Sequence, residues 1–204
     1  MKKIAIALAA LLTTTVVLGQ SQVYDNFEGT KVVAYGPWTG KLDTLASKTG
    51  PNNKTGKCAA YTRNKDKKFD YLKVNLQGTL QDVGLYATHT GNPPKLTMKV
   101  MTTAPVGTMV EIQLGEVGKN AYPAGTHSQY QAFTTVTNAW EELTFKFSQM
   151  PAGSEVKNES VNLITVLFNP NSLTADTWYF DDLSGPAVKT AMTTQESAPE
   201  GGTK

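Results

Sequence analysis

The sequence predicts an all-β fold, a two-sheet antiparallel β-sandwich of the jelly-roll type. First, nearly every periodic segment alternates apolar and polar residues with period two, which is typical of half-buried strands. Second, no long segment shows the helical period. Third, clusters of Gly, Pro and Asn separate the segments at short intervals, for example at 36–38, 91–94 and 169–172. About ten or eleven strands follow, a number that fits a jelly roll.

Residues 1–19 have the pattern of a secretory signal peptide. Lys2 and Lys3 form the basic region, residues 4–12 form the apolar region, and 17–19 form a small-residue cleavage site. We therefore expect an exported chain that is secreted, periplasmic or held at the cell surface. Because the apolar run is too short for a membrane span, we expect no membrane insertion.

The remaining chain predicts one domain over residues 20–184. The expected strands cover residues 23–28, 31–35, 57–63, 69–76, 82–87, 95–101, 108–114, 128–136, 140–147, 161–168 and 176–183. Segment 108–114 places Val110, Ile112 and Leu114 inward, with Glu111 and Gln113 outward. Segment 161–168 is apolar on both faces except for Asn162 and Thr165, as expected of a central strand. Residues 185–204 lack apolar periodicity and are rich in Thr, Gly, Ala and Pro, which predicts a disordered tail.

Charge and cysteine content exclude several classes of partner. Nineteen basic and 17 acidic residues give a formal charge of +2, and removal of Lys2 and Lys3 brings it to zero. No basic surface is therefore expected to attract nucleic acid or an anionic membrane. The single cysteine, Cys58, rules out an intramolecular disulfide and lies in an apolar run, where we expect a buried, inert thiol.

Acidic residues interrupt two apolar segments near the two ends of the domain, DNFE at 25–28 and WYFDDL at 178–183. Ionised carboxylates are almost never fully buried without a partner. They point to solvent at a strand end, or a cation holds them. Calcium suits such a place because it accepts six to eight carboxylate and carbonyl oxygens. From the residues alone, both alternatives stay open.

Five segments together resemble bacterial carbohydrate-binding modules of the galactose-binding-like jelly-roll type, over residues 22–184. They are DNFEG at 25–29, TGPNNKTG at 49–56, NAWEELTFKFS at 138–148, LITVLFNP at 163–170 and TWYFDDL at 177–183. The resemblance implies sugar binding on the concave sheet face or at the loop rim. It also implies a structural calcium shared by the first and last strands. Glu28 and Asp181 would be its ligands, with Asp25 and Asp182 as further candidates and backbone oxygens of loop 49–56 completing the shell.

A sugar site needs exposed aromatic faces beside planar polar groups. Trp38, in the loop 36–40, is the best platform candidate because no periodicity places it inside. Trp140 and Trp178 are expected to pack in or near the core. The other candidates alternate with apolar residues and are expected opposite the core, although ordinary half-exposed sheet residues would show the same pattern; they are Tyr61, Arg63, Tyr86, Tyr122, His127, Gln129 and Tyr130.

One segment, EIQLGE at 111–116, resembles the acidic strand motif of jelly-roll endo-glucanases. Gln113 stands where that motif has an aspartate, and Glu111 and Glu116 face opposite sides of a regular strand. Retaining hydrolysis requires two carboxyl groups about 5–5.5 Å apart. The sequence therefore favours a monomeric, non-catalytic module that binds a polysaccharide or oligosaccharide, for example a β-glucan. The alternatives are a structural or adhesive surface sandwich without a sugar site and, less favoured, a glycoside hydrolase.

Overall fold

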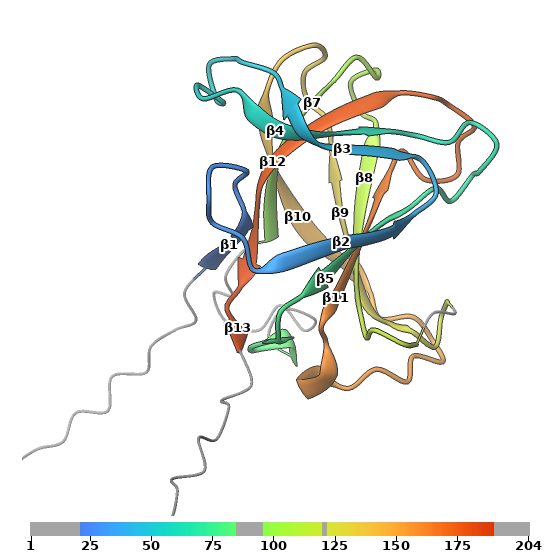
Figure 1. Cartoon of the computed structure of the whole chain (residues 1–204). Helices are drawn as coiled ribbons and strands as arrows, with labels where there is room; N and C mark the ends of the chain where they lie inside the picture. Colours follow the sequence, from blue (N-terminus) through green and yellow to red (C-terminus); the bar gives the residue numbers. More distant parts are fainter. Residues whose placement is uncertain (1–20, 85–95, 120–121, 190–204) are drawn as a thin grey trace, which may run out of the picture.

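The computed structural model describes residues 21–84, 96–119 and 122–189, and this part of the chain is an antiparallel β-sandwich (Figure 1). One 3-10 turn, η1 (Asn158–Ser160), precedes β11. The strands are β1 (Ser21–Asp25), β2 (Val33–Trp38), β3 (Lys41–Ser47), β4 (Lys57–Thr62), β5 (Leu72–Leu76), β6 (Thr79–Leu80), β7 (Leu96–Thr102), β8 (Met109–Gly115), β9 (Thr126–Phe133), β10 (Glu141–Gln149), β11 (Leu163–Phe168), β12 (Thr177–Pro186) and β13 (Val188–Lys189).

Two layers share one strand. The first layer has the order β2-β5-β11-β8-β9, and the second has the order β7-β12-β4-β3, with β1 added on β12. Strand β10 joins them, since residues 141–145 pair with β7 and residues from Lys146 onward pair with β9. The predicted two-sheet antiparallel jelly roll is confirmed.

The core lies between the layers and follows the period-two pattern. Val110, Ile112 and Leu114 of β8 are fully buried, while Glu111 and Gln113 lie on the opposite face of the same strand. Central strand β11 lies between β5 and β8, as the apolar segment 161–168 predicts. Trp178 is buried against Phe168, with ring centroids 5.1 Å apart. Trp140 and Cys58 are also buried, so these packing predictions are confirmed.

Some elements differ from the prediction. Strand β3 was not predicted, because it is an edge strand whose residues are only partly buried and whose Leu45 is 91% exposed. Of the expected strand 82–87, residues 82–84 are described, and they do not form a strand. Within the described residues, no helix has the length and hydrophobicity needed to cross a bilayer.

The predicted start of the tail, at residue 185, is too early in the chain. Strand β12 continues to Pro186, and β13 pairs with β6, so the prediction of disorder is wrong for residues 185–189. The hydroxyl of Tyr24 donates a hydrogen bond to the Pro186 carbonyl at 2.7 Å, and Gly185 packs against the same ring. Backbone pairing holds this segment, and such pairing leaves no apolar period in the sequence. Residues 1–19 and 190–204 lie outside the described residues.

Candidate functional site

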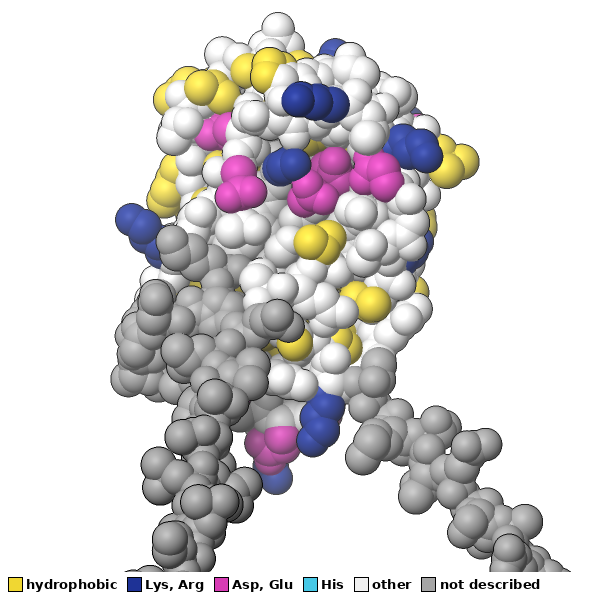
Figure 2. Space-filling model, turned by 90° about the vertical axis from the view of Figure 1, so that its left-hand side faces the viewer, with side chains coloured by type: hydrophobic (Ala, Val, Ile, Leu, Met, Phe, Trp, Pro, Cys, Tyr) yellow, Lys and Arg dark blue, Asp and Glu magenta, His cyan; other side chains and the backbone are white. Residues whose placement is uncertain are grey.

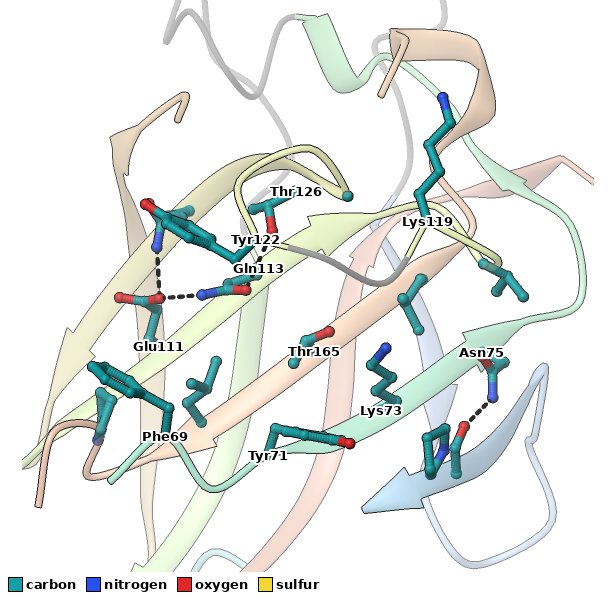
Figure 3. Close-up of a pocket in the computed structure, with 18 of the residues that line it drawn as sticks. Phe69, Tyr71, Lys73, Asn75, Glu111, Gln113, Lys119, Tyr122, Thr126 and Thr165 are labelled. Carbon is teal, nitrogen blue, oxygen red and sulfur yellow. Dashed lines mark hydrogen bonds between the residues drawn. The ribbon is translucent and has the colours of Figure 1, made fainter. Parts of the chain in front are cut away.

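A groove of about 1270 Å³ lies on the outer face of the β5-β11-β8-β9 layer (Figure 3). Its floor comes from the side chains that alternate with the core residues of these strands. Phe69 and Tyr122 border it and are 64% and 59% exposed, respectively. The polar and aromatic residues of the lining are Tyr71, Lys73, Asn75, Glu111, Gln113, Lys119, Thr126, Gln129, Thr165 and Asn171, together with these two rings.

A row of directly paired polar residues crosses the sheet. Lys73 pairs with Thr165, Thr165 with Gln113, Gln113 with Gln129, and Gln129 with Gln149. Residues paired in this way point to the same face of a sheet. The part of the row that lines the groove runs from Lys73 to Gln129. Since neighbouring strands are about 4.7–4.9 Å apart, this part extends about 14 Å across the strands. The groove is therefore long enough for an extended ligand that runs across the strands.

Glu111 lies in the groove floor and accepts hydrogen bonds from three glutamine side chains. Its Oε1 accepts from Gln113 Nε2 and from Gln129 Nε2, both at 2.8 Å, and its Oε2 accepts from Gln131 Nε2 at 2.9 Å. Gln149 Nε2 donates to Gln129 Oε1 at 2.6 Å. The residue is 7% exposed, so amide groups, and not water, chiefly stabilise its carboxylate.

Aromatic rings lie on both sides of this floor. Figure 3 shows Phe69 and Tyr71 on one side of Glu111 and Thr165, and Tyr122 on the other. Burial lowers the pKa of Lys73, whose Nζ lies 5.6 Å from the Tyr71 ring centroid. Aromatic faces pack against apolar C–H surfaces, and amides exchange hydrogen bonds with hydroxyl groups.

The structure brings two of the predicted sugar-site residues, Tyr122 and Gln129, to this groove. Trp38 is 43% exposed, but its neighbours Gly36 and Pro37 line the groove and Trp38 does not. Tyr86 lies outside the described residues.

Tyr61 and Arg63 are buried, so the prediction that they lie opposite the core is wrong. Tyr61 donates a hydrogen bond to Asp70 Oδ1 at 2.9 Å. The Arg63 guanidinium donates to Ser172 Oγ at 2.8 Å and to the Thr174 carbonyl at 3.1 Å. Their polar ends therefore find partners inside the protein, which period-two counting does not reveal.

His127 and Tyr130 are also buried, and the same prediction is wrong for them. The pairing of β8 with β9 shifts register between Leu114 and Gly115, a β-bulge that interrupts the alternation of β9. His127 Nε2 lies 2.7 Å from Asn158 Oδ1. Burial lowers the pKa of His127, and the contact with Asn158 partly opposes this effect.

Most residues of the groove floor were not predicted from the sequence, including Tyr71, Lys73, Asn75 and Thr165. The available signal was their outward position in period-two segments, as recognised for Glu111 and Gln113. These positions are neighbours only because of the strand order, and local sequence patterns do not reveal that order.

The acidic candidates lie on the other layer, where β1 pairs with β12. Figure 2 shows Asp and Glu side chains gathered on one face, with Lys side chains beside them. Glu28 Oε1 accepts a hydrogen bond from Thr55 Oγ1 in loop 49–56. Asp181 is 3% exposed, and its pKa is raised to about 7 by burial, by Asp182 and, to a smaller extent, by Glu28.

Asp25 and Asp182 differ from Glu28 and Asp181 because each has a lysine nearby. Asp25 is buried, and its Oδ2 has no hydrogen-bond partner in the described part of the chain, with Lys31 Nζ 3.9 Å away. Asp182 forms an ion pair with Lys99 at 2.6 Å. Among the residues that the structure describes, no three or more Asp, Glu, His or Cys side chains converge on one point. A cation here would therefore need carbonyl or amide oxygens as well, which calcium accepts.

Comparison with known proteins adds the following. No protein family model and no curated protein matches the sequence. A family 11 carbohydrate-binding module from Clostridium thermocellum, in complex with a β-1,3-1,4-mixed-linked tetrasaccharide, is similar at a TM-score of 0.49 and 12% identity, covering 85% of this chain and 99% of that one. An exo-β-agarase is similar at a TM-score of 0.52 and 9% identity, covering 82% of this chain and 25% of that one.

A third similar structure is SGBP-B from a xyloglucan utilization locus in Bacteroides uniformis, with a TM-score of 0.47 and 12% identity, covering 81% of this chain and 49% of that one. The similarity is one of fold. Carbohydrate-binding modules are among the solved structures to which the chain is similar, and at these identities the similarity concerns the fold alone.

Proposed function

We propose that the chain is an exported, non-catalytic module that binds a polysaccharide or oligosaccharide in the groove over β5, β11, β8 and β9. The observation that carries the proposal is the row of hydrogen-bonding side chains between exposed aromatic rings. Sugar chains present apolar C–H faces and hydroxyl edges in alternation. The groove offers a partner for each, with rings at its borders and amides along its floor.

A neutral glycan, such as a β-glucan, is the ligand class that we propose. Apart from Lys73 at one end, the part of the paired row that lines the groove consists of Thr165, Gln113 and Gln129, which are uncharged and exchange hydrogen bonds with hydroxyl groups. Glu111 in the centre of the floor disfavours an anionic sugar at that position, because like charges repel in a partly desolvated site. All residues that line the groove belong to one copy of the chain, which is consistent with a monomer.

Binding is favoured over hydrolysis by the carboxyl groups of the groove. Glycosidases commonly use two carboxyl groups that flank the scissile bond. Among the described lining residues, Glu111 is the only acid, and three amides occupy its oxygens. Glu116 does not line the groove and instead accepts a hydrogen bond from Ser160 Oγ at 2.9 Å.

The proposal includes a structural calcium ion held by Glu28 and Asp181. The support is the raised pKa of the buried Asp181 carboxyl and the proximity of Glu28, which adds repulsion between the two groups. A divalent cation would convert this repulsion into attraction and join β12 to the loop after β1. Lys99 compensates Asp182, so Asp182 is not proposed as a ligand.

Affinity electrophoresis in gels containing mixed-linkage β-glucan, laminarin or xylan tests the sugar site. We expect at least one of these polysaccharides to retard the wild type. Tyr122→Ala and Phe69→Ala should weaken binding roughly tenfold each, because central aromatic contacts supply much of the binding free energy. Trp38→Ala is the matched control, since this exposed ring does not line the groove.

Two results would contradict the proposal. Absence of retardation in all polysaccharides, with a folded protein, would favour the structural or adhesive sandwich. Loss of binding in Trp38→Ala, with Tyr122→Ala and Phe69→Ala unchanged, would place the sugar outside the groove. Equal melting temperatures for the three variants would show that the differences arise from the ligand contacts.

A further inference from the structure

The hydrogen bonds of the groove floor have a common direction. Gln113 and Gln131 donate directly to Glu111, and Gln149 donates to Gln129, which donates to Glu111 in turn. Each of these side chains comes from β8, β9 or β10, so the chain of hydrogen bonds crosses three strands. Every one of these bonds ends, directly or through Gln129, on the same carboxylate.

This direction follows from the chemistry of the acceptor. An ionised carboxylate only accepts hydrogen bonds, so a neighbouring amide must turn its NH2 group, and not its carbonyl group, toward it. A glutamine amide beside a neutral partner can take either of two orientations of similar shape. Glu111 fixes the orientation of the Gln113, Gln129 and Gln131 amides, because each turns its NH2 group toward the carboxylate. The carbonyl of Gln129 then points to Gln149, whose NH2 group donates to it.

The charge of Glu111 is not used in an ion pair. The ion pairs found in the described part of the chain join Lys31 to Asp25, Lys99 to Asp182 and Lys119 to Glu116. Lys146 is the cross-strand partner of Gln131, and Lys73 lies in the neighbouring row. In the described part of the chain, the Glu111 oxygens accept hydrogen bonds from glutamine amides, which is the arrangement expected of a carboxylate that orients dipoles.

We propose that Glu111 is a positioning residue, whose carboxylate fixes the orientation of the glutamine amides so that the groove presents one preset pattern of donors and acceptors to the ligand. The inference rests on the proposed sugar-binding function. Gln113 and Gln129, which line the groove, each keep a second N–H and part of their carbonyl capacity for a hydroxyl group of the ligand. Because the orientation is set before binding, the ligand does not have to order these side chains, and less affinity is lost on association.

The first experiment uses no ligand. Side-chain amide signals of Gln113, Gln129 and Gln131 are recorded by NMR in the wild type and in Glu111→Gln. We expect shifted, slowly exchanging amide protons in the wild type and a change toward the values of exposed glutamines in the variant. Glu141→Gln is the matched control, because the Glu141 carboxylate accepts hydrogen bonds from Thr135 and Val136 outside the groove. Unchanged glutamine signals in Glu111→Gln would overturn the proposal.

The second experiment measures the dissociation constant for mixed-linkage β-glucan. Glu111→Gln should bind at least about tenfold more weakly at an unchanged melting temperature, a loss comparable to that of one charge-assisted hydrogen bond. Gln129→Ala should weaken binding in the wild type and much less in the Glu111→Gln background, since the contribution of Gln129 depends on its orientation. Strict additivity of the two substitutions would overturn the proposal.

The two experiments separate this inference from the function on which it rests. If the wild type binds none of the polysaccharides while its glutamine signals depend on Glu111, the proposed function is wrong and the orienting role of Glu111 stands as a property of the sheet. If the polysaccharide binds and the signals do not depend on Glu111, the function stands and the positioning role is wrong.

Discussion

At the scale of single residues, two neighbouring strands place polar side chains on opposite faces. Glu111 of β8 faces the groove, and His127 of β9 is buried at the bulge beside Gly115. Both are held by side-chain amides, Glu111 by glutamines and His127 by Asn158. Burial disfavours the charged form of His127 and so lowers its pKa.

His127 should make the protein less stable in acid. Its pKa in the folded protein is lowered by burial, so the unfolded chain binds the proton first as the pH falls below about 6.5. The contribution of His127 to the free energy of unfolding should therefore decrease between pH 7.5 and pH 5, while Asp181, whose pKa is raised to about 7, contributes in the opposite direction. Urea unfolding at several pH values measures the slope, and His127→Gln should show a smaller slope over this range. An equal slope in both proteins would contradict the assignment to His127.

Single residues differ in how well their place could be predicted. Trp140, Trp178 and Cys58 were placed correctly because apolar side chains in apolar segments have few alternatives to burial. The prediction for Tyr61 and Arg63 was wrong because an amphipathic side chain can bury its polar end where that end forms hydrogen bonds. Their partners, Asp70 for Tyr61 and Ser172 for Arg63, come from loops whose positions depend on the whole fold.

At the scale of strands, apolar alternation predicted β7, β8, β10 and β11 well, since each buries a clear face. Edge and terminal strands such as β3 were harder to predict, because backbone pairing, and not a buried face, holds them. The end of β12 belongs to this group. It pairs with β1 through Gly185 and Pro186, beyond the last clearly apolar residue of the segment.

The end of the domain should therefore lie at residue 189 and not at residue 184. A chain that ends at Lys189 should melt at the same temperature as the mature protein. A chain that ends at Ser184 loses the pairs of β1 with Gly185 and Pro186, the Tyr24 hydrogen bond and strand β13. Its melting temperature should fall by about 4 °C or more, given about 1 kcal/mol per lost buried hydrogen bond.

Differential scanning calorimetry of the two shortened chains and the mature protein makes this comparison. Equal melting temperatures for all three would show that residues 185–189 add nothing to stability. A loss in the chain that ends at Lys189 would instead place stabilising contacts in residues 190–204.

At the scale of the whole molecule, the two ends of the domain meet. Strand β1 pairs with β12, and Glu28 follows β1 while Asp181 lies within β12 (Figure 1). A contact between them closes a loop of more than 150 residues, and such long-range closure is costly in chain entropy. A calcium ion that joins these two carboxylates would therefore act on the stability of the entire sandwich.

Calcium should raise the melting temperature of the mature protein relative to a chelator. At one hundred times Kd the gain is about 2.7 kcal/mol, or roughly 5–10 °C for a domain of this size. Magnesium should be less effective, because it requires tight octahedral geometry and retains its water. Asp181→Asn should not respond to calcium, whereas Asp182→Asn should respond, since Lys99 already pairs with Asp182. Identical melting curves of the wild type in calcium and in chelator would rule out the ion.

The groove illustrates what one sequence does not reveal. Lys73, Thr165, Gln113 and Gln129 were each visible as a polar position, and Gln113 lay in a segment predicted with the correct inward and outward faces. Their assembly into one row depends on the strand order β5-β11-β8-β9, in which neighbours in space are far apart in the chain. Local periodicity carries no information about that order.

The register of the groove also determines how freely its surface can change. Each strand beneath it alternates one residue for the ligand with one for the core, so that Gln113 lies between the buried Ile112 and Leu114. Substitutions at Lys73, Thr165 and Gln129 therefore leave the packed layer intact. A combinatorial library at these outward positions, selected on different polysaccharides, would convert the same sandwich into binders of new specificity while its thermal stability stays near that of the parent.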